Sequence, residues 1–218
     1  CDKVCSDVNA KDYSDIENAV LTGAGKEADV LFEAGVTNTL LVNADKETNG
    51  QTLYINVNGN DKNQSGKIIV NVEDNVTFTI IENFKGESST EGRVALRTLI
   101  DTGLNSKVRL IQVYMQPESI DVLSDTGCRL SDNASFEIVQ VFVGRGSLYD
   151  GIRTELIGNN SAFTADIGYL GAKKQNIDIN LISNHIGKKT NSGIRVDGAL
   201  KDEASKLFRG SIDFKNGS

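Results

Sequence analysis

Asparagine-containing turns recur along this sequence at a nearly constant spacing. Each turn is polar and comes just before a new apolar stretch, and successive turns are about 30, 28, 27 and 31 residues apart. The five asparagines are Asn75, Asn105, Asn133, Asn160 and Asn191. A period of this length is typical of solenoids, in which one supersecondary unit is repeated and stacked along an axis. The spacing therefore predicts a coil with about thirty residues per turn.

Apolar and polar residues alternate with a period of two between these turns. The pattern is clear in residues 108–114, 136–143, 163–169 and 177–181. In the last of these stretches, Ile177, Ile179 and Leu181 share one face of a strand, and two polar residues lie on the other. Each repeat has room for about two strands that bury one face. A mainly β fold is therefore predicted.

A sandwich of antiparallel hairpins gives a similar spacing of short strands. The Asn-Gly and Asp-Gly dipeptides that mark tight hairpins do not coincide with the repeating asparagine turns. They occur at residues 49–50, 58–59, 150–151, 197–198 and 216–217. The predicted exterior is polar throughout, as expected when stacked coils bury only their inner face. We therefore favour a parallel β-helix, a single-stranded solenoid, over a sandwich.

The beginning of the chain has a helical pattern instead. Ser14 and Glu17 form a capping box, in which the two side chains satisfy free backbone N–H groups at the start of a helix. A second short helix is predicted from about residue 26 to residue 34, and Gly35 is its stop signal. The chain is thus divided into an N-terminal helical segment, residues 1–36, and a β-helix core domain, residues 37–218.

Composition and charge restrict the partners of the chain. Its 23 basic and 30 acidic residues give a formal net charge of −7, which repels the phosphates of nucleic acids and of anionic membranes. No apolar run approaches the ~18 residues needed to span a bilayer. We therefore expect neither a nucleic-acid partner nor a membrane partner.

Two residues are candidates for cofactor binding, and each also has a structural explanation. His185, the only histidine, suits iron and titrates near neutral pH, but its polar neighbours favour a structural turn. Arg129 would lower the pKa of the Cys128 thiol, yet a lone cysteine in a strand is usually just a small apolar residue. Cys1 and Cys5 lack a second Cys or His pair to complete a metal site. Three cysteines fit a reducing cytoplasm, and we assign no catalytic or metal-binding residue.

Four short motifs follow one another in the last part of the chain. They are His185, a Thr-x-Ser at residues 190–192, Gly198 and a Phe-x-Gly at residues 208–210. With residues 156–161, they belong to a stretch of about 65 residues that begins near Tyr149 and ends at Ile212. This joint pattern resembles the core of the SufB/SufD family of iron–sulfur cluster assembly proteins. Residues 75–148 share only the strand rhythm of that family.

The resemblance implies a right-handed β-helix that serves as a non-catalytic scaffold in a Suf-type iron–sulfur cluster assembly complex in the cytoplasm. It also implies partners, namely a SufC-type ATPase and a SufB- or SufD-like subunit that pairs with the chain through the β-helices. No cofactor is assigned to this chain, and a cluster would belong to the full complex. A SufB-like subunit is expected to carry a cysteine where Thr154 stands, so the chain looks more like SufD. The family's cluster-assembly residues are expected after Ser218, so the chain looks truncated at its C-terminus.

A carbohydrate-active β-helix enzyme or a surface adhesin is the alternative. Such a protein would grip a polysaccharide in an acidic groove along its parallel strands. Aromatic residues make up only 6% of this chain and Trp is absent, which is a poor composition for stacking on sugars. The scaffold reading is therefore favoured, while the oligomeric state and the SufB or SufD role stay open.

Overall fold

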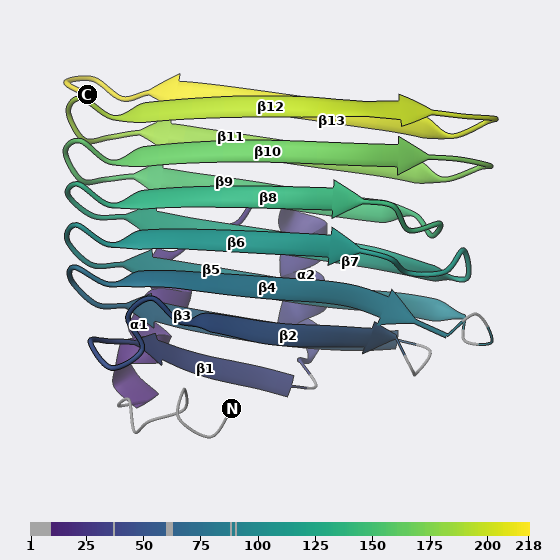
Figure 1. The fold of residues 1–218 in the computed structure, drawn as a ribbon, viewed down its shortest axis with the longest axis horizontal. Helices are drawn as coiled ribbons and strands as arrows, with labels where there is room; N and C mark the ends of the chain where they lie inside the picture. Colours follow the sequence, from purple (N-terminus) through teal and green to yellow (C-terminus); the bar gives the residue numbers. More distant parts are fainter. Residues whose placement is uncertain (1–9, 37, 60–62, 88, 90) are drawn as a thin grey trace.

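A computed structural model describes residues 10–36, 38–59, 63–87, 89 and 91–218 of the chain. In this part of the chain, two short helices precede thirteen strands that coil through about six turns (Figure 1). The elements are α1 (Ala10–Ala19), α2 (Lys26–Ala34), β1 (Asn38–Ala44), β2 (Thr52–Gly59), β3 (Asn63–Val72), β4 (Thr77–Gly86), β5 (Gly92–Thr102), β6 (Lys107–Tyr114), β7 (Ile120–Leu130), β8 (Ser135–Phe142), β9 (Leu148–Leu156), β10 (Ala162–Gly171), β11 (Asn176–His185), β12 (Asn191–Leu200) and β13 (Ser205–Phe214).

The strands alternate between two parallel sheets that face each other. The odd-numbered strands form a seven-stranded sheet in the order β1-β3-β5-β7-β9-β11-β13, and the even-numbered strands form a six-stranded sheet from β2 to β12. Every pairing between the described strands is parallel. In Figure 1 the even strands run to the right in front and the odd strands run to the left behind, while the chain rises. The fold is therefore a right-handed parallel β-helix as predicted, and the sandwich is excluded.

The core lies between the two sheets and is filled by the inward-facing residue of every second position. In β11, Ile177, Ile179 and Leu181 are buried, and the polar residues between them face outward. Equivalent side chains of successive turns stack on one another, as do the rings of Phe136 and Phe163, whose centroids are 5.7 Å apart. Such aromatic pairs add about 0.5–1.5 kcal/mol beyond their buried area. The predicted alternation is confirmed in this sheet geometry.

Four of the repeating asparagines form a ladder at the corner where the chain passes from the odd to the even sheet. Asn75, Asn105, Asn133 and Asn160 all adopt a left-handed backbone, with φ between 55° and 62°. The Nδ2 groups of Asn105, Asn133 and Asn160 each donate a hydrogen bond to the Oδ1 atom of the asparagine one turn before, at 3.0–3.1 Å. Asn tolerates this conformation better than other non-glycine residues. The sequence period is therefore the period of the coil.

The fifth asparagine is not part of this ladder. Lys189 has the left-handed backbone at the next corner, with φ of 57°, and Asn191 is the first residue of β12. The prediction that Asn191 continues the series is wrong, because Lys189, two residues earlier, occupies the turn position. Asn191 and Lys189 are nearly the same distance from Asn160, so the period alone could not separate them.

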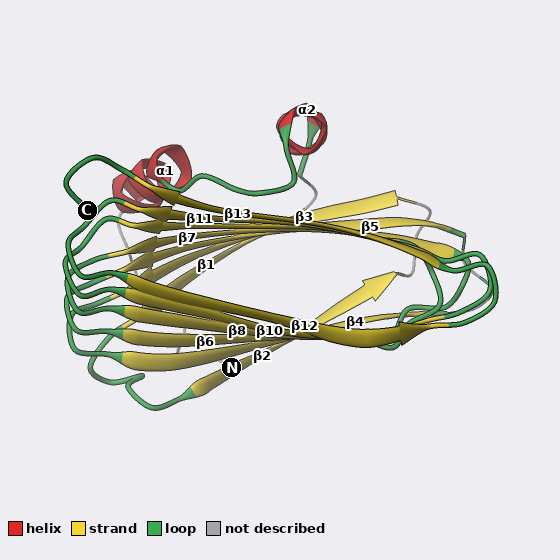
Figure 2. Ribbon diagram, turned by 90° about the horizontal axis from the view of Figure 1, so that it is seen from above, coloured by secondary structure: helices red, strands yellow, loops and turns green. Residues whose placement is uncertain are grey.

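The two helices cover the outer face of the odd sheet (Figure 2). Tyr13, Ile16 and Val20 of the N-terminal helical segment pack on Ile69 and Leu99, which point outward from β3 and β5. The exterior is therefore not polar throughout, because the outward residues beneath the helices are apolar. Helix α2 has the predicted bounds and ends at Gly35.

The predicted capping box is wrong. Helix α1 already begins at Ala10, so Ser14 lies within it and does not stand at its start. The Ser-x-x-Glu pattern is short and also occurs inside helices, where the backbone N–H groups are already bonded within the helix.

Candidate functional site

His185 is the last residue of β11 and is almost fully buried. Its Nδ1 atom lies 2.7 Å from the Thr190 hydroxyl oxygen, and its Nε2 atom lies 2.8 Å from that of Ser192. The ring stacks on Phe214 with centroids 4.5 Å apart, and burial lowers the pKa of the imidazole. The His and Thr-x-Ser motifs thus meet in one hydrogen-bonded cluster. Because both ring nitrogens are engaged, this geometry favours a structural role over metal ligation.

Cys128 faces the core from β7, with 1% of its surface exposed. Burial and the nearby Asp101 carboxylate raise the pKa of its thiol. Arg129 points to the other face of the sheet, where Nε and Nη2 each donate a 2.8 Å hydrogen bond to Asp101. The expectation that Arg129 lowers the thiol pKa is therefore wrong, because its guanidinium binds Asp101 on the far side of the strand. The thiol is held in its protonated, unreactive form.

Thr154 occupies the inward position directly beside Cys128, one turn later in the coil. It is fully buried, and its hydroxyl lies 3.2 Å from the Ser183 hydroxyl of the following turn. Cys128, Thr154 and Ser183 thus form a short row of small side chains across β7, β9 and β11. Cys1 and Cys5 lie outside the described residues.

A connected group of polar side chains crosses the core, and it was not predicted from the sequence. Its members face inward from both sheets and are at most 4% exposed. This core polar column consists of Glu82, Thr98, Gln112, Tyr114, Ser124, Gln140 and Asp150. Buried polar groups of this kind are retained only where they bond to one another.

The hydrogen bonds of the column run from turn to turn. The Glu82 carboxylate accepts bonds of 2.8 Å from the Thr98 hydroxyl and 2.7 Å from Gln112 Nε2. Gln140 Nε2 donates to Gln112 Oε1 at 2.7 Å and to both carboxylate oxygens of Asp150 at 3.0 Å. The column therefore links two acids through two amides, with Glu82 at one end and Asp150 at the other.

Both acids of the column have raised pKa values. Desolvation by burial raises the pKa of Glu82 to about 6, although its bonds from Gln112 and Thr98 oppose the change. Burial raises the pKa of Asp150 to about 7, against the opposing hydrogen bond from Gln140. The two carboxyl groups thus hold and release protons near neutral pH, inside a core from which water is excluded.

The sequence does contain a signal for this column. Glu82, Gln112 and Gln140 occupy the inward phase of β4, β6 and β8, at spacings of 30 and 28 residues. These spacings equal the turn period, so a polar residue recurs in an apolar row at the same place in each turn. Strand alternation indicates which face of the sheet a residue lies on. A polar residue that recurs on the inward face once per turn therefore predicts a row of polar side chains inside the core.

The last turn of the described coil has an uncovered inner face. Strands β12 and β13 each have one neighbour and lie at the same end of the two sheets. Leu200, Ile212 and Phe214 face inward beside Gly171, Ser183 and His185 of the preceding turn, and they are 43%, 44% and 69% exposed. The equivalent residues of earlier turns are covered by the next turn.

A family model described as "SUF system FeS cluster assembly, SufBD core domain" matches residues 54–218, about three quarters of the chain. The chain belongs to the SufBD family. The match extends the similarity well before the motifs at the C-terminal end and takes in nearly all of the β-helix. A search of curated proteins gave no significant match.

Membership of the SufBD family gives the chain a role in iron–sulfur cluster assembly by the SUF system and favours an assembly component over a carbohydrate-active protein. A cluster in this system is the cargo of assembly. Among the described residues no group of three or more His, Cys, Asp or Glu side chains is arranged to hold a metal. The buried Cys128 and the fully bonded His185 do not fit as ligands in this arrangement. None of the helices described here is long and apolar enough to cross a membrane.

Proposed function

We propose that this chain is a non-catalytic, SufD-like scaffold subunit that pairs with a SufB- or SufD-like subunit through its β-helix. The observation that carries the proposal is the match of the SufBD core domain to residues 54–218, which belong to a parallel β-helix of two packed sheets. Stacked coils of this kind form a rod with a fixed shape, which suits a scaffold on which other subunits dock.

The SufD-like assignment is supported by the chemistry of one position. Thr154 stands where a SufB-like subunit is expected to carry a cysteine, and its hydroxyl is bonded to Ser183. A hydroxyl does not relay sulfur and does not ligate iron as a thiolate does. We therefore assign sulfur transfer to a partner and the rigid docking surface to this chain. A SufC-type ATPase in the same cytoplasmic complex would supply the energy for assembly.

The test is co-expression of the full-length protein with SufB-like and SufC-like subunits, followed by affinity purification and measurement of mass in solution. The chain is expected to be recovered with both subunits, in a complex whose mass exceeds that of this chain alone. A folded protein that elutes alone and never associates with either subunit would contradict the proposal.

A further inference from the structure

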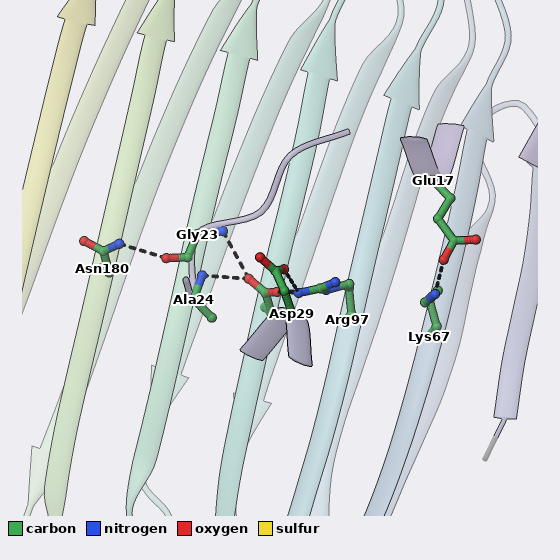
Figure 3. Close-up of polar contacts among 8 residues, drawn as sticks. Glu17, Gly23, Ala24, Asp29, Lys67, Arg97 and Asn180 are labelled. Atoms are coloured by element: carbon green, nitrogen blue, oxygen red, sulfur yellow. Dashed lines mark hydrogen bonds and ion pairs between the residues drawn. The ribbon is translucent and has the colours of Figure 1, made fainter. Parts of the chain in front are cut away.

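One row of outward residues crosses the odd sheet along the axis of the coil. The row runs from β3 to β11 at a single height, because each member is the register partner of the next. This outer row consists of Lys67, Arg97, Asp125, Gly151 and Asn180. The N-terminal helical segment lies along it and contacts every member, and Figure 3 shows the contacts to Lys67, Arg97 and Asn180.

The centre of the outer row contacts the main chain of the segment directly. A Cβ atom on Gly151 would lie 2.1 Å from the backbone nitrogen of Ala24, and one on Gly23 would lie 2.4 Å from that of Ile152. A Cβ atom on the neighbouring Gly127 would lie 2.5 Å from the Leu21 carbonyl oxygen. Side chains are excluded from both sides of this contact. Residues 21–24, which bend at Gly23 and Ala24, therefore lie in a shallow groove whose floor is the sheet backbone.

Side chains of the outer row bind both polar groups of the Gly23 backbone. Asp125 Oδ1 accepts hydrogen bonds from the N–H groups of Gly23 at 3.1 Å and Ala24 at 2.8 Å. Asn180 Nδ2 donates a 2.8 Å hydrogen bond to the Gly23 carbonyl oxygen. This is how proteins recognise a peptide ligand, with main-chain bonds for affinity and a steric requirement for specificity. The requirement here is a residue without a side chain between Asp125 and Asn180.

Charged pairs fix the two helices on either side of the groove. Arg97 Nη2 lies 2.6 Å from Asp29 of α2 and 2.6 Å from Asp125, and its guanidinium lies 4.4 Å above the Phe32 ring. Lys67 forms an ion pair with Glu17 of α1. The contacts therefore span the segment from its first helix to its second.

The segment packs outside the main hydrophobic core of the β-helix. The buried residues of that core all lie from Val42 onward, whereas the helices pack on outward residues of the odd sheet in two small clusters. The two parts are joined by the short stretch after α2, where Gly35 has φ of 155°. A short hinge between two such parts is the arrangement that permits exchange of a segment between copies.

We propose that the outer row is an exchangeable peptide-binding site, and that the N-terminal segment of a second copy of this chain binds it in place of the segment seen in Figure 3. The ligand is a main-chain segment with glycine between Asp125 and Asn180, flanked by acidic helices that reach Lys67 and Arg97. Binding is independent of any role in cluster assembly.

The test uses the full chain with a protease site inserted directly after Gly35. The chain is cut once folded, and a fluorescently labelled synthetic peptide of residues 10–36 is added. The cut segment is expected to remain bound during gel filtration and then to exchange with the labelled peptide in a saturable manner. A Gly23→Ala peptide is expected to bind at least tenfold more weakly, because its methyl group meets the backbone of Ile152.

A Val30→Ala peptide is the matched control. Val30 is 65% exposed on α2, so its truncation is expected to change the dissociation constant less than twofold. Asp125→Asn in the cut chain should also weaken binding about tenfold, since a charge-assisted bond becomes a neutral one. Failure of the labelled peptide to enter the cut chain, or equal binding of the Gly23→Ala peptide, would overturn the proposal.

Discussion

The two sheets bury their inner faces alike, but their outer faces differ. On the even sheet, Arg109 and Glu137 form an ion pair between neighbouring strands in which the side chains are 55% and 36% exposed. On the odd sheet, Arg97 and Asp125 form a pair with the same spacing of 28 residues, and their side chains are 12% and 0% exposed. The N-terminal segment causes the difference, because it covers only the odd sheet (Figure 2).

The comparison shows that sequence spacing alone does not determine what a charged pair contributes. An exposed pair is screened by water and contributes about 0–1 kcal/mol. A buried pair makes the loss of one partner costly, because the other charge stays desolvated. The covered sheet therefore depends on its charges, whereas the bare sheet is stable largely without them.

The largest expected effect comes from removing one acid of each pair. Asp125→Ala leaves Arg97 without its buried partner and frees the backbone N–H groups of Gly23 and Ala24, so the free energy of unfolding should fall by about 3–5 kcal/mol. Glu137→Ala, the control on the even sheet, should cost less than about 1 kcal/mol. Urea unfolding followed by circular dichroism measures both. Equal losses would show that the N-terminal segment does not protect the buried pair.

The inner faces should respond to pH in a way that the exposed faces do not. The pKa values of Glu82 and Asp150 are raised in the folded protein to about 6 and about 7, so the stability they contribute is present below their unfolded values, near pH 4, and is lost as pH rises to about 7. At ~1.4 kcal/mol per pH unit for each group, the two acids together lose about 4 kcal/mol between pH 5 and pH 8. Urea unfolding at pH 5 and pH 8 measures it.

The control for this pH effect is an exposed acid on the even sheet. A double variant, Glu82→Gln with Asp150→Asn, should narrow the difference in unfolding free energy between the two pH values by most of that amount. Glu137→Gln removes a carboxylate that is 36% exposed and should leave the difference in place. If the double variant keeps the full pH dependence, the acids of the core polar column are not its source.

A smaller effect is expected from adding one methyl group to an outward glycine of each sheet. Gly151→Ala places a Cβ atom 2.1 Å from the Ala24 backbone and should cost about 1–3 kcal/mol as the segment shifts. Gly168→Ala on the even sheet meets only the Gln140 carbonyl oxygen, at 3.9 Å, and should stabilise by about 0.5 kcal/mol. Hydrogen exchange at the Gly23 and Ala24 amides should speed up in the first variant only. Unchanged exchange there would contradict a tight groove.

The β-helix could be predicted because two independent local signals agree on it. Alternation identifies the strands and their buried face, and the left-handed asparagines such as Asn105 and Asn133 recur once per turn. Both signals are properties of residues close together in the sequence. They also set the limit of the prediction, because a period averaged over turns did not distinguish Asn191 from Lys189.

The outer row and the bonds between the sheets in the core polar column could not be predicted in the same way, although the period does mark Glu82, Gln112 and Gln140 as one inward row. Asp125 is an ordinary acid in sequence, and its burial depends on Gly23, about a hundred residues earlier. Glu82 and Asp150 lie on facing sheets and meet only through Gln112 and Gln140. These contacts are set by how the turns and the N-terminal segment pack, so they require the three-dimensional arrangement.

The smallest expected effect concerns the corner that joins the two sheets. Lys189 has the backbone of the ladder asparagines but no amide to continue it. Lys189→Asn should donate a hydrogen bond to the free Oδ1 atom of Asn160 and stabilise the protein by about 0.5–1 kcal/mol. Lys189→Gly relieves the left-handed backbone without adding the bond, so it separates conformational preference from the ladder itself. If the two variants unfold at the same urea concentration, the added hydrogen bond contributes nothing to stability. The exposed ladder would then resemble the bare even sheet, because its stability would depend on the backbone conformation and not on its polar side chains.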